Sequence, residues 1–183
     1  MKKLIILVSA VALSTTMFAQ KGTADNPYSL EGTVNFTGSE GITWAAPSVR
    51  ARYFFKDNLA ARIDLGYSSK SMEDVGDSSS SSIGLGIEYH LAGNDKMSPY
   101  FYGGLALGST SMKSEGEDAS KTSNLGFGVK AGLDYYISEN LYVGVEIDLV
   151  NFKTSSSGDG EDKTTTTDLN FAGGSAIRLG WRF

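Results

Sequence analysis

Apolar and polar side chains alternate along most of the chain, and this period of two constrains the fold more strongly than any other feature of the sequence. In "IGLGIEYHL", from Ile83 to Leu91, every odd position is apolar, whereas glycine, glutamate and histidine occupy the even positions. The stretches 125–137 and 141–149 repeat the pattern. Successive side chains of a strand point to opposite faces of a sheet. The sequence therefore predicts strands that each have one apolar and one polar face.

Eight such strands are predicted, and the connections between them are of two alternating kinds. The strands are expected near residues 28–37, 44–56, 59–71, 79–91, 99–113, 122–138, 141–154 and 165–183. Short connections, such as "KDN" and "SEN", alternate with longer ones rich in serine, glycine and acid, such as "SMEDVGDSSS" and "SSSGDGEDKT". This order predicts an all-β fold, an eight-stranded antiparallel up-and-down barrel with tight turns at one end and acidic loops at the other.

Residues 1–19 are predicted to be a signal peptide that precedes a single barrel domain of residues 20–183. Two lysines lead into an apolar run from Leu4 to Leu13, and "STTMFAQ" follows it. The run is too short to cross a bilayer as a helix, which argues against a membrane anchor. Cleavage after Ala19 removes both lysines and changes the formal net charge from −5 to −7. An acidic chain disfavours nucleic acid as a partner, and the absence of cysteine excludes disulfides and thiolate metal sites.

The alternation fits a soluble barrel, apolar inside, as well as a membrane barrel, apolar outside, and other features favour the second. Nine residues from Ile83 to Leu91, tilted by about 40°, cover about 23 Å, close to the ~25 Å apolar band of outer-membrane barrels. Glycine falls mostly on the expected inner face, where small residues relieve crowding, although weakened strands or bulges are an alternative reading. Aromatic residues gather at strand ends, as in the girdles at membrane–water interfaces. The expected girdle consists of Tyr28, Trp44, Tyr53, Phe55, Tyr67, Tyr89, Phe101 and Tyr135.

If the apolar face points outward, the lumen receives six acids and six bases. The expected lumen charges are Glu31, Arg50, Arg52, Arg62, Asp64, Glu88, Lys130, Asp134, Glu146, Asp148, Arg178 and Arg182. The interior of an eight-stranded barrel is only just wide enough for side chains to fill. We therefore expect these charges to neutralise one another as a salt-bridge network.

The last strand alternates up to Phe183, with Ile177, Leu179 and Trp181 at every second position before it. With these features, the chain from Gln20 onward resembles the small eight-stranded outer-membrane barrels of the OmpA/OmpX type, which are found in Gram-negative bacteria. The resemblance implies that the four alternating residues act as the C-terminal signal read by the barrel-assembly machinery. It also implies an outer-membrane location, with lipid and lipopolysaccharide as neighbours and both termini in the periplasm. Nothing follows Phe183, so the peptidoglycan-binding domain of larger relatives is not expected.

No catalytic site, metal site or cofactor is expected. Barrels of this size that act on lipid A carry a histidine near the extracellular rim, but His90, the one histidine here, is expected at the periplasmic end. It is interpreted as a lumen histidine hydrogen-bonded near Glu88. Acid pairs such as Glu146 and Asp148 are interpreted as salt-bridge partners rather than acid–base catalysts. The loop acids lack the spacing of a known calcium loop.

Two functions remain open at this point. The first is a structural or surface-interaction barrel, whose lumen is plugged by charge pairs and whose acidic loops meet a surface ligand that the sequence does not identify. The second is a narrow diffusion channel for small solutes, although barrels with an open aqueous channel use about sixteen strands. A soluble secreted barrel that binds a small apolar ligand is a third alternative.

Overall fold

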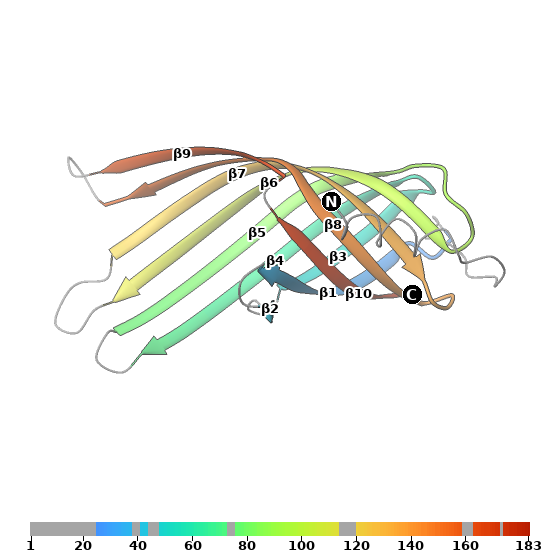
Figure 1. The fold of residues 1–183 in the computed structure, drawn as a ribbon, viewed down its shortest axis with the longest axis horizontal. Coiled ribbons are helices and arrows are strands. Elements are labelled where there is room, and N and C mark those ends of the chain that lie inside the picture. Colours follow the sequence, from blue (N-terminus) through green and yellow to red (C-terminus); the bar gives the residue numbers. More distant parts are fainter. Residues whose placement is uncertain are drawn as a thin grey trace.

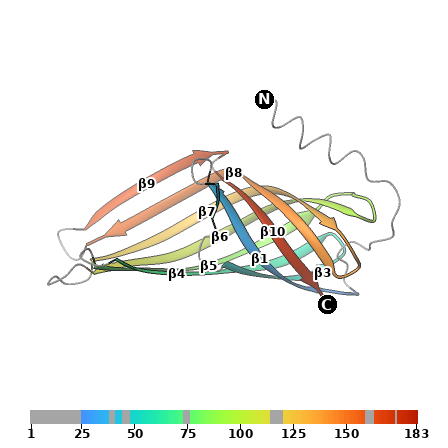
Figure 2. The same cartoon turned by 60° about the horizontal axis from the view of Figure 1, so that its bottom comes forward.

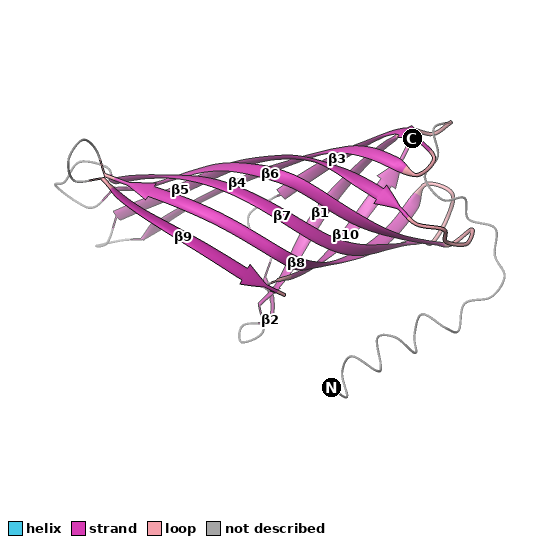
Figure 3. Cartoon of the chain, turned by 90° about the horizontal axis from the view of Figure 1, so that it is seen from above, coloured by secondary structure: helices cyan, strands magenta, loops and turns pink. Residues whose placement is uncertain are grey.

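The strands pair side by side until the last one meets the first. The computed structural model describes residues 25–37, 41–43, 48–72, 76–113, 120–158, 163–172 and 174–183. The strands are β1 (Tyr28–Thr37), β2 (Gly41–Thr43), β3 (Ser48–Lys56), β4 (Leu59–Met72), β5 (Gly76–His90), β6 (Met97–Lys113), β7 (Ser120–Tyr136), β8 (Leu141–Ser157), β9 (Thr164–Phe171) and β10 (Ser175–Arg182) (Figure 1). Within the described ranges there is no helix long and apolar enough to cross a membrane (Figure 3).

A closed ring of eight antiparallel strands results from these pairings. Its order is β1, β3, β4, β5, β6, β7, β8 and β10, and β10 pairs with both β8 and β1 to close it. The short β2 adds to β1, and β9 adds to β8. The expected eight-stranded up-and-down barrel is therefore confirmed. Closure gives every ring strand a partner on both sides where the strands form the ring, as a sheet that spans lipid requires.

The final strand differs from the expectation, because 165–183 is split into β9 and β10. Ala172, in the "AGG" between them, has a positive φ of 51°. The break lies opposite a bulge in β8, where Val129 pairs with Val150 but Lys130 pairs with Asp148, so one residue of β8 is extra. A bulge bends a strand and shifts the phase of its side chains. Beyond it, odd residues of β8 such as Lys153 face the lumen.

The apolar face of the sheet points outward, and the polar face points into the ring. Ile83, Leu107 and Leu125 form one row across β5, β6 and β7 and are 41%, 56% and 52% exposed. On the opposite face, Glu88 and Asp134 are completely buried. A soluble barrel would show the reverse arrangement, so the structure has the polarity of a membrane barrel.

The ring has two different ends. The turns that join β3 to β4, β5 to β6 and β7 to β8 lie at one end with Phe183, as expected for the short connections (Figure 1). At the other end, β4 to β9 extend well beyond β1, β3 and β10 (Figure 2). Most of the longer acidic connections, residues 1–24 and Trp44 lie outside the described residues, as do the expected signal peptide and part of the expected strand 44–56.

Where the strands extend, the outward face changes from apolar to hydroxyl side chains. We call this surface the hydroxyl belt. By strand alternation and pairing it comprises Ser69, Ser79, Ser81, Ser109, Ser111, Ser123, Thr154, Ser156, Thr165 and Thr167. Cross-strand contacts link its members, such as the 3.3 Å hydrogen bond between Ser156 and Thr165. The belt lies directly beyond the apolar row of Ile83, Leu107 and Leu125.

Candidate functional site

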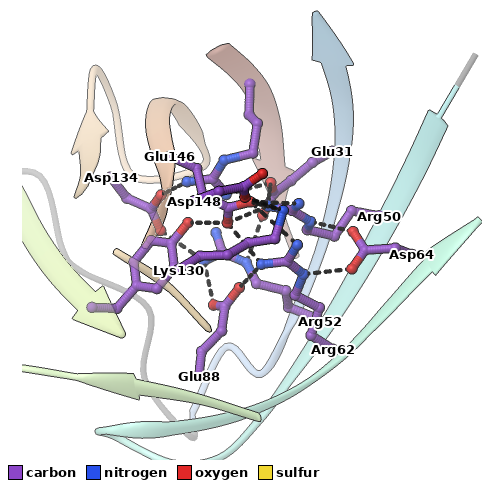
Figure 4. Close-up of polar contacts among 12 residues, drawn as sticks. Glu31, Arg50, Arg52, Arg62, Asp64, Glu88, Lys130, Asp134, Glu146 and Asp148 are labelled. Carbon is purple, nitrogen blue, oxygen red and sulfur yellow. Dashed lines mark hydrogen bonds and ion pairs between the residues drawn. The ribbon is translucent and has the colours of Figure 1, made fainter. Parts of the chain in front are cut away.

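The candidate site is the layer of charged side chains inside the ring, near the short-turn end. Each side chain projects inward because it alternates with the outward-facing apolar residues of its own strand. The six bases and six acids come from seven strands, β1, β3, β4, β5, β7, β8 and β10. Figure 4 shows that the labelled side chains of this layer converge from opposite walls of the ring.

Glu146 is the centre of the half of this layer nearest the long-loop end. Both of its oxygens accept hydrogen bonds from Arg50, at 3.1 and 3.2 Å, and Arg62 donates at 2.7 Å. The hydroxyl of Tyr100 donates to the same carboxylate at 2.8 Å. Asp64 bridges the two arginines, with its oxygens 2.6 Å from Nε of Arg50 and 2.7 Å from Nε of Arg62. Planar guanidinium groups with several fixed donors suit such shared, bidentate contacts.

The half nearest the short-turn end is built around two other arginines. Arg52 lies 2.6 Å from Glu31, 2.9 Å from Glu88 and 2.7 Å from Asp134. Arg178 reaches the first and last of these carboxylates, at 2.6 and 2.8 Å. All five side chains are completely buried. Each acid therefore has a cation within reach, as burial of charge in a water-poor interior requires.

The two halves are joined, so eleven of the twelve expected lumen charges form one connected set of ion pairs. Arg50 lies 3.5 Å from Glu31 and links the halves, and Arg62 links them a second time through Glu88. At the rim of the layer, Lys130 pairs with Asp148 at 2.8 Å, and both side chains are about one quarter exposed, at 25% and 23%. The twelfth residue, Arg182, is buried and lies over the ring of Tyr136, 5.7 Å from its centroid.

Sequence reasoning assigned no role in the lumen to the aromatic side chains that fill the space between the charges. Tyr100, Tyr102, Tyr136 and Tyr142 are buried inside the ring, together with Phe54. The Tyr142 hydroxyl donates to Glu31 at 2.8 Å, and the Arg62 guanidinium stacks 3.8 Å above the ring of Tyr102. The four tyrosines occupy even-numbered positions of β6, β7 and β8, as the lumen-facing Asp134 and Glu146 do. This shared position is the signal that could have placed their rings in the lumen.

Glycine makes room for these rings on the neighbouring strand. Tyr100 is paired with Gly132, and Tyr142 with Gly180. A Cβ added at either glycine would overlap the tyrosine ring opposite it. Gly132 and Gly180 are therefore packing sites for aromatic rings, which supports the crowding interpretation at these two positions.

A Ser–His–Glu chain occurs beside the network, with a geometry similar to that of a nucleophilic catalytic site. Nδ1 of His90 is 2.8 Å from the Ser98 hydroxyl, and Nε2 is 3.2 Å from Glu88. However, Ser98 is only 1% exposed, and Glu88 is already bound by Arg52 and Arg62. A nucleophile must reach its substrate. This arrangement is therefore a buried polar contact, and among the described residues no group of acids and histidine is arranged to hold a metal ion.

Beyond the charged layer, toward the long-loop end, the lumen is a cavity of about 810 Å³. Its wall comes from β3 to β8, and its floor includes Arg50, Arg62 and Asp64. The inward positions at this level are small, for example Gly84, Ala106 and Gly128. The same inner face that is filled with charges and rings near the short turns is therefore empty above them.

The expected girdle and C-terminal residues lie on the outer surface. Ile177, Leu179, Trp181 and Phe183 are between 36% and 60% exposed. Tyr28, Tyr53, Phe55, Tyr67, Tyr89 and Phe101 are between 42% and 60% exposed, and Tyr135 is half-buried. Tyr67 lies at the other end of the apolar band, beside Ser81 of the hydroxyl belt. Trp44 lies outside the described residues.

Comparison with known proteins gives one family and several similar structures. Residues 5–183 match the family model described as "Outer membrane protein beta-barrel domain". The barrel domain of Pseudomonas aeruginosa OprF is 18% identical, with 89% of this chain and 100% of that chain covered and a TM-score of 0.48. OprG of the same organism is 16% identical, with 92% and 99% covered and a TM-score of 0.49. Neisserial surface protein A is 18% identical, with 83% and 93% covered and a TM-score of 0.45. The curated protein sequences contain no match.

Proposed function

The chain belongs to the outer membrane protein beta-barrel family of Gram-negative bacteria, and we propose that it serves there as a structural, surface-interacting barrel whose lumen is closed. The observation that carries the proposal is the connected network across the lumen. The four arginines and four of the carboxylates at its centre have side chains no more than 5% exposed. This burial supports the inference that the layer leaves no continuous water path at that level.

Contacts with the membrane are part of the same proposal. The apolar rows face lipid, and the hydroxyl belt faces the saccharide part of lipopolysaccharide, because hydroxyl side chains both donate to and accept from sugar hydroxyls. In this orientation the long acidic connections face the environment and any surface ligand. The short turns, Tyr28 and Phe183 face the periplasm, so both termini lie on that side.

Assembly is proposed to use the outward face of β10. Ile177, Leu179, Trp181 and Phe183 present an apolar and aromatic edge of alternate residues, and the barrel-assembly machinery reads these four. The strand is also the one that closes the ring, since it pairs with both β1 and β8. A recognition signal on this strand would couple insertion to closure.

No catalytic activity is proposed for the chain. The one described constellation with a nucleophile, Ser98 with His90 and Glu88, is buried. Its carboxylate is held by arginines that would have to be displaced before it could assist His90. The proposal needs no metal and no cofactor.

The test is single-channel conductance of the refolded chain, residues 20–183, in a planar bilayer. Folding is checked independently by the heat-dependent shift of the barrel in gel electrophoresis. A silent bilayer with folded protein is the expected result. Steady conductance steps that change size in Glu146→Gln would overturn the closed-lumen proposal.

A narrow channel is the second candidate, and one observation favours it. The cavity of about 810 Å³ already opens the lumen on the long-loop side, so the charged layer and the aromatic rings packed within it are what block passage. Rearrangement of pairs at its rim, such as Lys130 with Asp148, would have to open a path through the layer below. In that case Arg178→Gln, deep in the layer, should change conductance, whereas Lys121→Gln on the outer surface should not.

A further inference from the structure

The cavity above the charged layer has the size of a ligand site but an unusual lining. Its volume of about 810 Å³ falls in the range of small-molecule pockets, about 300–1,000 Å³. Most such pockets are apolar. Here the wall carries the hydroxyls of Ser68, Ser80 and Thr110 and the amides of Asn124 and Asn151. A ligand for this space must therefore be rich in hydrogen-bonding groups.

The charge of the lining is positive, although the protein as a whole is acidic. Among the residues that the structure describes, the cavity is lined by five basic side chains, Arg50, Arg62, Lys70, Lys130 and Lys153, and by one acid, Asp64. The formal net charge of the chain is −5. This local reversal of sign means that the cavity attracts anions even though the protein does not.

Asp64 does little to offset the basic groups, because it is already engaged. It lies between Arg50 and Arg62, at 2.6 and 2.7 Å, and the same arginines bind Glu146. The charges of Arg50 and Arg62 in the floor are therefore neutralised by acids of the charged layer. The positive charge that remains for a ligand comes from lysines of the wall, nearer the long-loop end.

Lys70 and Lys153 supply that remaining charge. Lys70 belongs to β4 and Lys153 to β8, which stand near opposite ends of the arc of strands that lines the cavity. Neither forms an ion pair with any residue in the part of the chain that the structure describes. Lys130, at a lower level, is paired with Asp148 but keeps a quarter of its side chain exposed. Asp168 of β9 is the cross-strand neighbour of Lys153, whereas Lys70 has Ser78 opposite it. An incoming oxyanion thus meets two ammonium groups on facing walls, of which that of Lys70 has no acid opposite it in the strand register.

We propose that this cavity binds a small solute that carries both an oxyanion and several hydroxyl groups, as a phosphorylated sugar does. Lys70 and Lys153 hold the oxyanion, and the serine, threonine and asparagine side chains exchange hydrogen bonds with the hydroxyls. The charged layer forms the floor against which the solute rests. This goes beyond the proposed structural role and holds whether or not the layer opens to conduct ions.

Glucose 6-phosphate is a suitable probe because its two halves can be tested separately. The barrel is refolded in zwitterionic detergent, and binding is measured by isothermal titration calorimetry for glucose 6-phosphate, glucose and inorganic phosphate. The proposal expects glucose 6-phosphate to bind more tightly than either fragment, and added salt to weaken the binding. No binding of the sugar phosphate, or equal affinity for it and glucose, would overturn the proposal. Equal affinity for it and inorganic phosphate would refute the role of the hydroxyls.

A pair of matched double variants separates the cavity from general charge effects. Lys70→Gln with Lys153→Gln removes these two charges of the wall, and we expect the affinity for glucose 6-phosphate to fall by about tenfold or more, since hydrogen bonds to charged groups are strong. The control is Lys56→Gln with Lys121→Gln, which changes the net charge equally but at exposed positions outside the cavity lining. All four lysines are solvent-accessible, and the gel shift verifies that both variants fold. Equal losses in the two variants would show that binding is nonspecific attraction and would reject the site.

Discussion

Tyr28 and Phe183 close the barrel by exchanging two backbone hydrogen bonds. The amide of Phe183 donates to the carbonyl of Tyr28 at 3.0 Å, and the amide of Tyr28 donates back at 3.3 Å. Their rings stack on the outer surface with centroids 6.3 Å apart. The first residue of β1 and the residue after β10 thus form the last rung of the ring, and their side chains are both exposed where lipid meets water.

Replacing Phe183 should weaken this closing rung without removing it. In Phe183→Ala both backbone hydrogen bonds remain possible, but the stacked ring is lost, and an aromatic pair contributes about 0.5–1.5 kcal/mol. We expect a corresponding decrease in the free energy of unfolding and a lower temperature for the gel shift. The control is Phe171→Ala at the far end of β9, where the side chain is 69% exposed. Equal losses in both variants would contradict a special role for the rung.

Arg178 should be far more sensitive to substitution than an exposed base. In Arg178→Met the carboxylates of Glu31 and Asp134 lose a cation at 2.6 and 2.8 Å, and loss of one partner of a buried pair costs about 3–5 kcal/mol. Arg178→Lys keeps the charge but cannot reach both carboxylates with a planar fork, so an intermediate loss is expected. Urea unfolding of the refolded barrel measures these losses, with Lys121→Met as the exposed control. An unchanged urea midpoint for Arg178→Met would show that the network contributes nothing to stability.

Strand alternation was enough to predict the barrel and which charged residues share one face of it. The height of the apolar stripe and the aromatic residues at the strand ends were needed to predict that this charged face points inward. Glu31, Arg52 and Glu88 each lie on a stretch of strand in which every second residue is apolar, and each occupies a position between those apolar residues. The bulge in β8 could not be predicted in this way, because one extra residue near Leu149 shifts every later side chain to the opposite face. The odd-numbered residues of β8 after the bulge, including Lys153, were therefore not predicted to face the lumen.

The choice of partners inside the lumen also lay beyond the sequence. Arg50 and Glu146 are 96 positions apart, and they meet only because the stagger of the strands brings β3 and β8 to the same height. The pairing of tyrosines with glycines depends on the same registers, since Tyr100 meets Gly132 only when β6 and β7 are correctly aligned. The alternation of residues along one strand contains no information about the register in which that strand pairs with its neighbour.

Gly132 should tolerate no side chain as long as Tyr100 lies across it. A Cβ at this position would overlap the tyrosine ring, and overpacking of this kind costs about 1–3 kcal/mol. We therefore expect Gly132→Ala to lower the free energy of unfolding by that amount, as measured by urea unfolding. In Gly103→Ala, where nothing lies within 4 Å of the added Cβ, no loss is expected. Combining Gly132→Ala with Tyr100→Ala should remove the penalty of the first substitution, and an additive double variant would refute the contact.

Replacing Ala172 by glycine should increase the stability of the protein. Its φ of 51° places it in the left-handed region, where a side chain costs about 1–2 kcal/mol. Its amide donates to the carbonyl of Leu149 at 3.1 Å, so the strained residue is held against the bulge of β8. We expect Ala172→Gly to raise the free energy of unfolding, by about 1 kcal/mol at most because glycine also loosens the unfolded chain. Ala176→Gly, in the regular part of β10, should instead lower it by about 0.5–1 kcal/mol. Urea unfolding of the two variants gives opposite signs if the break between β9 and β10 is strained at Ala172, and the same sign if it is not.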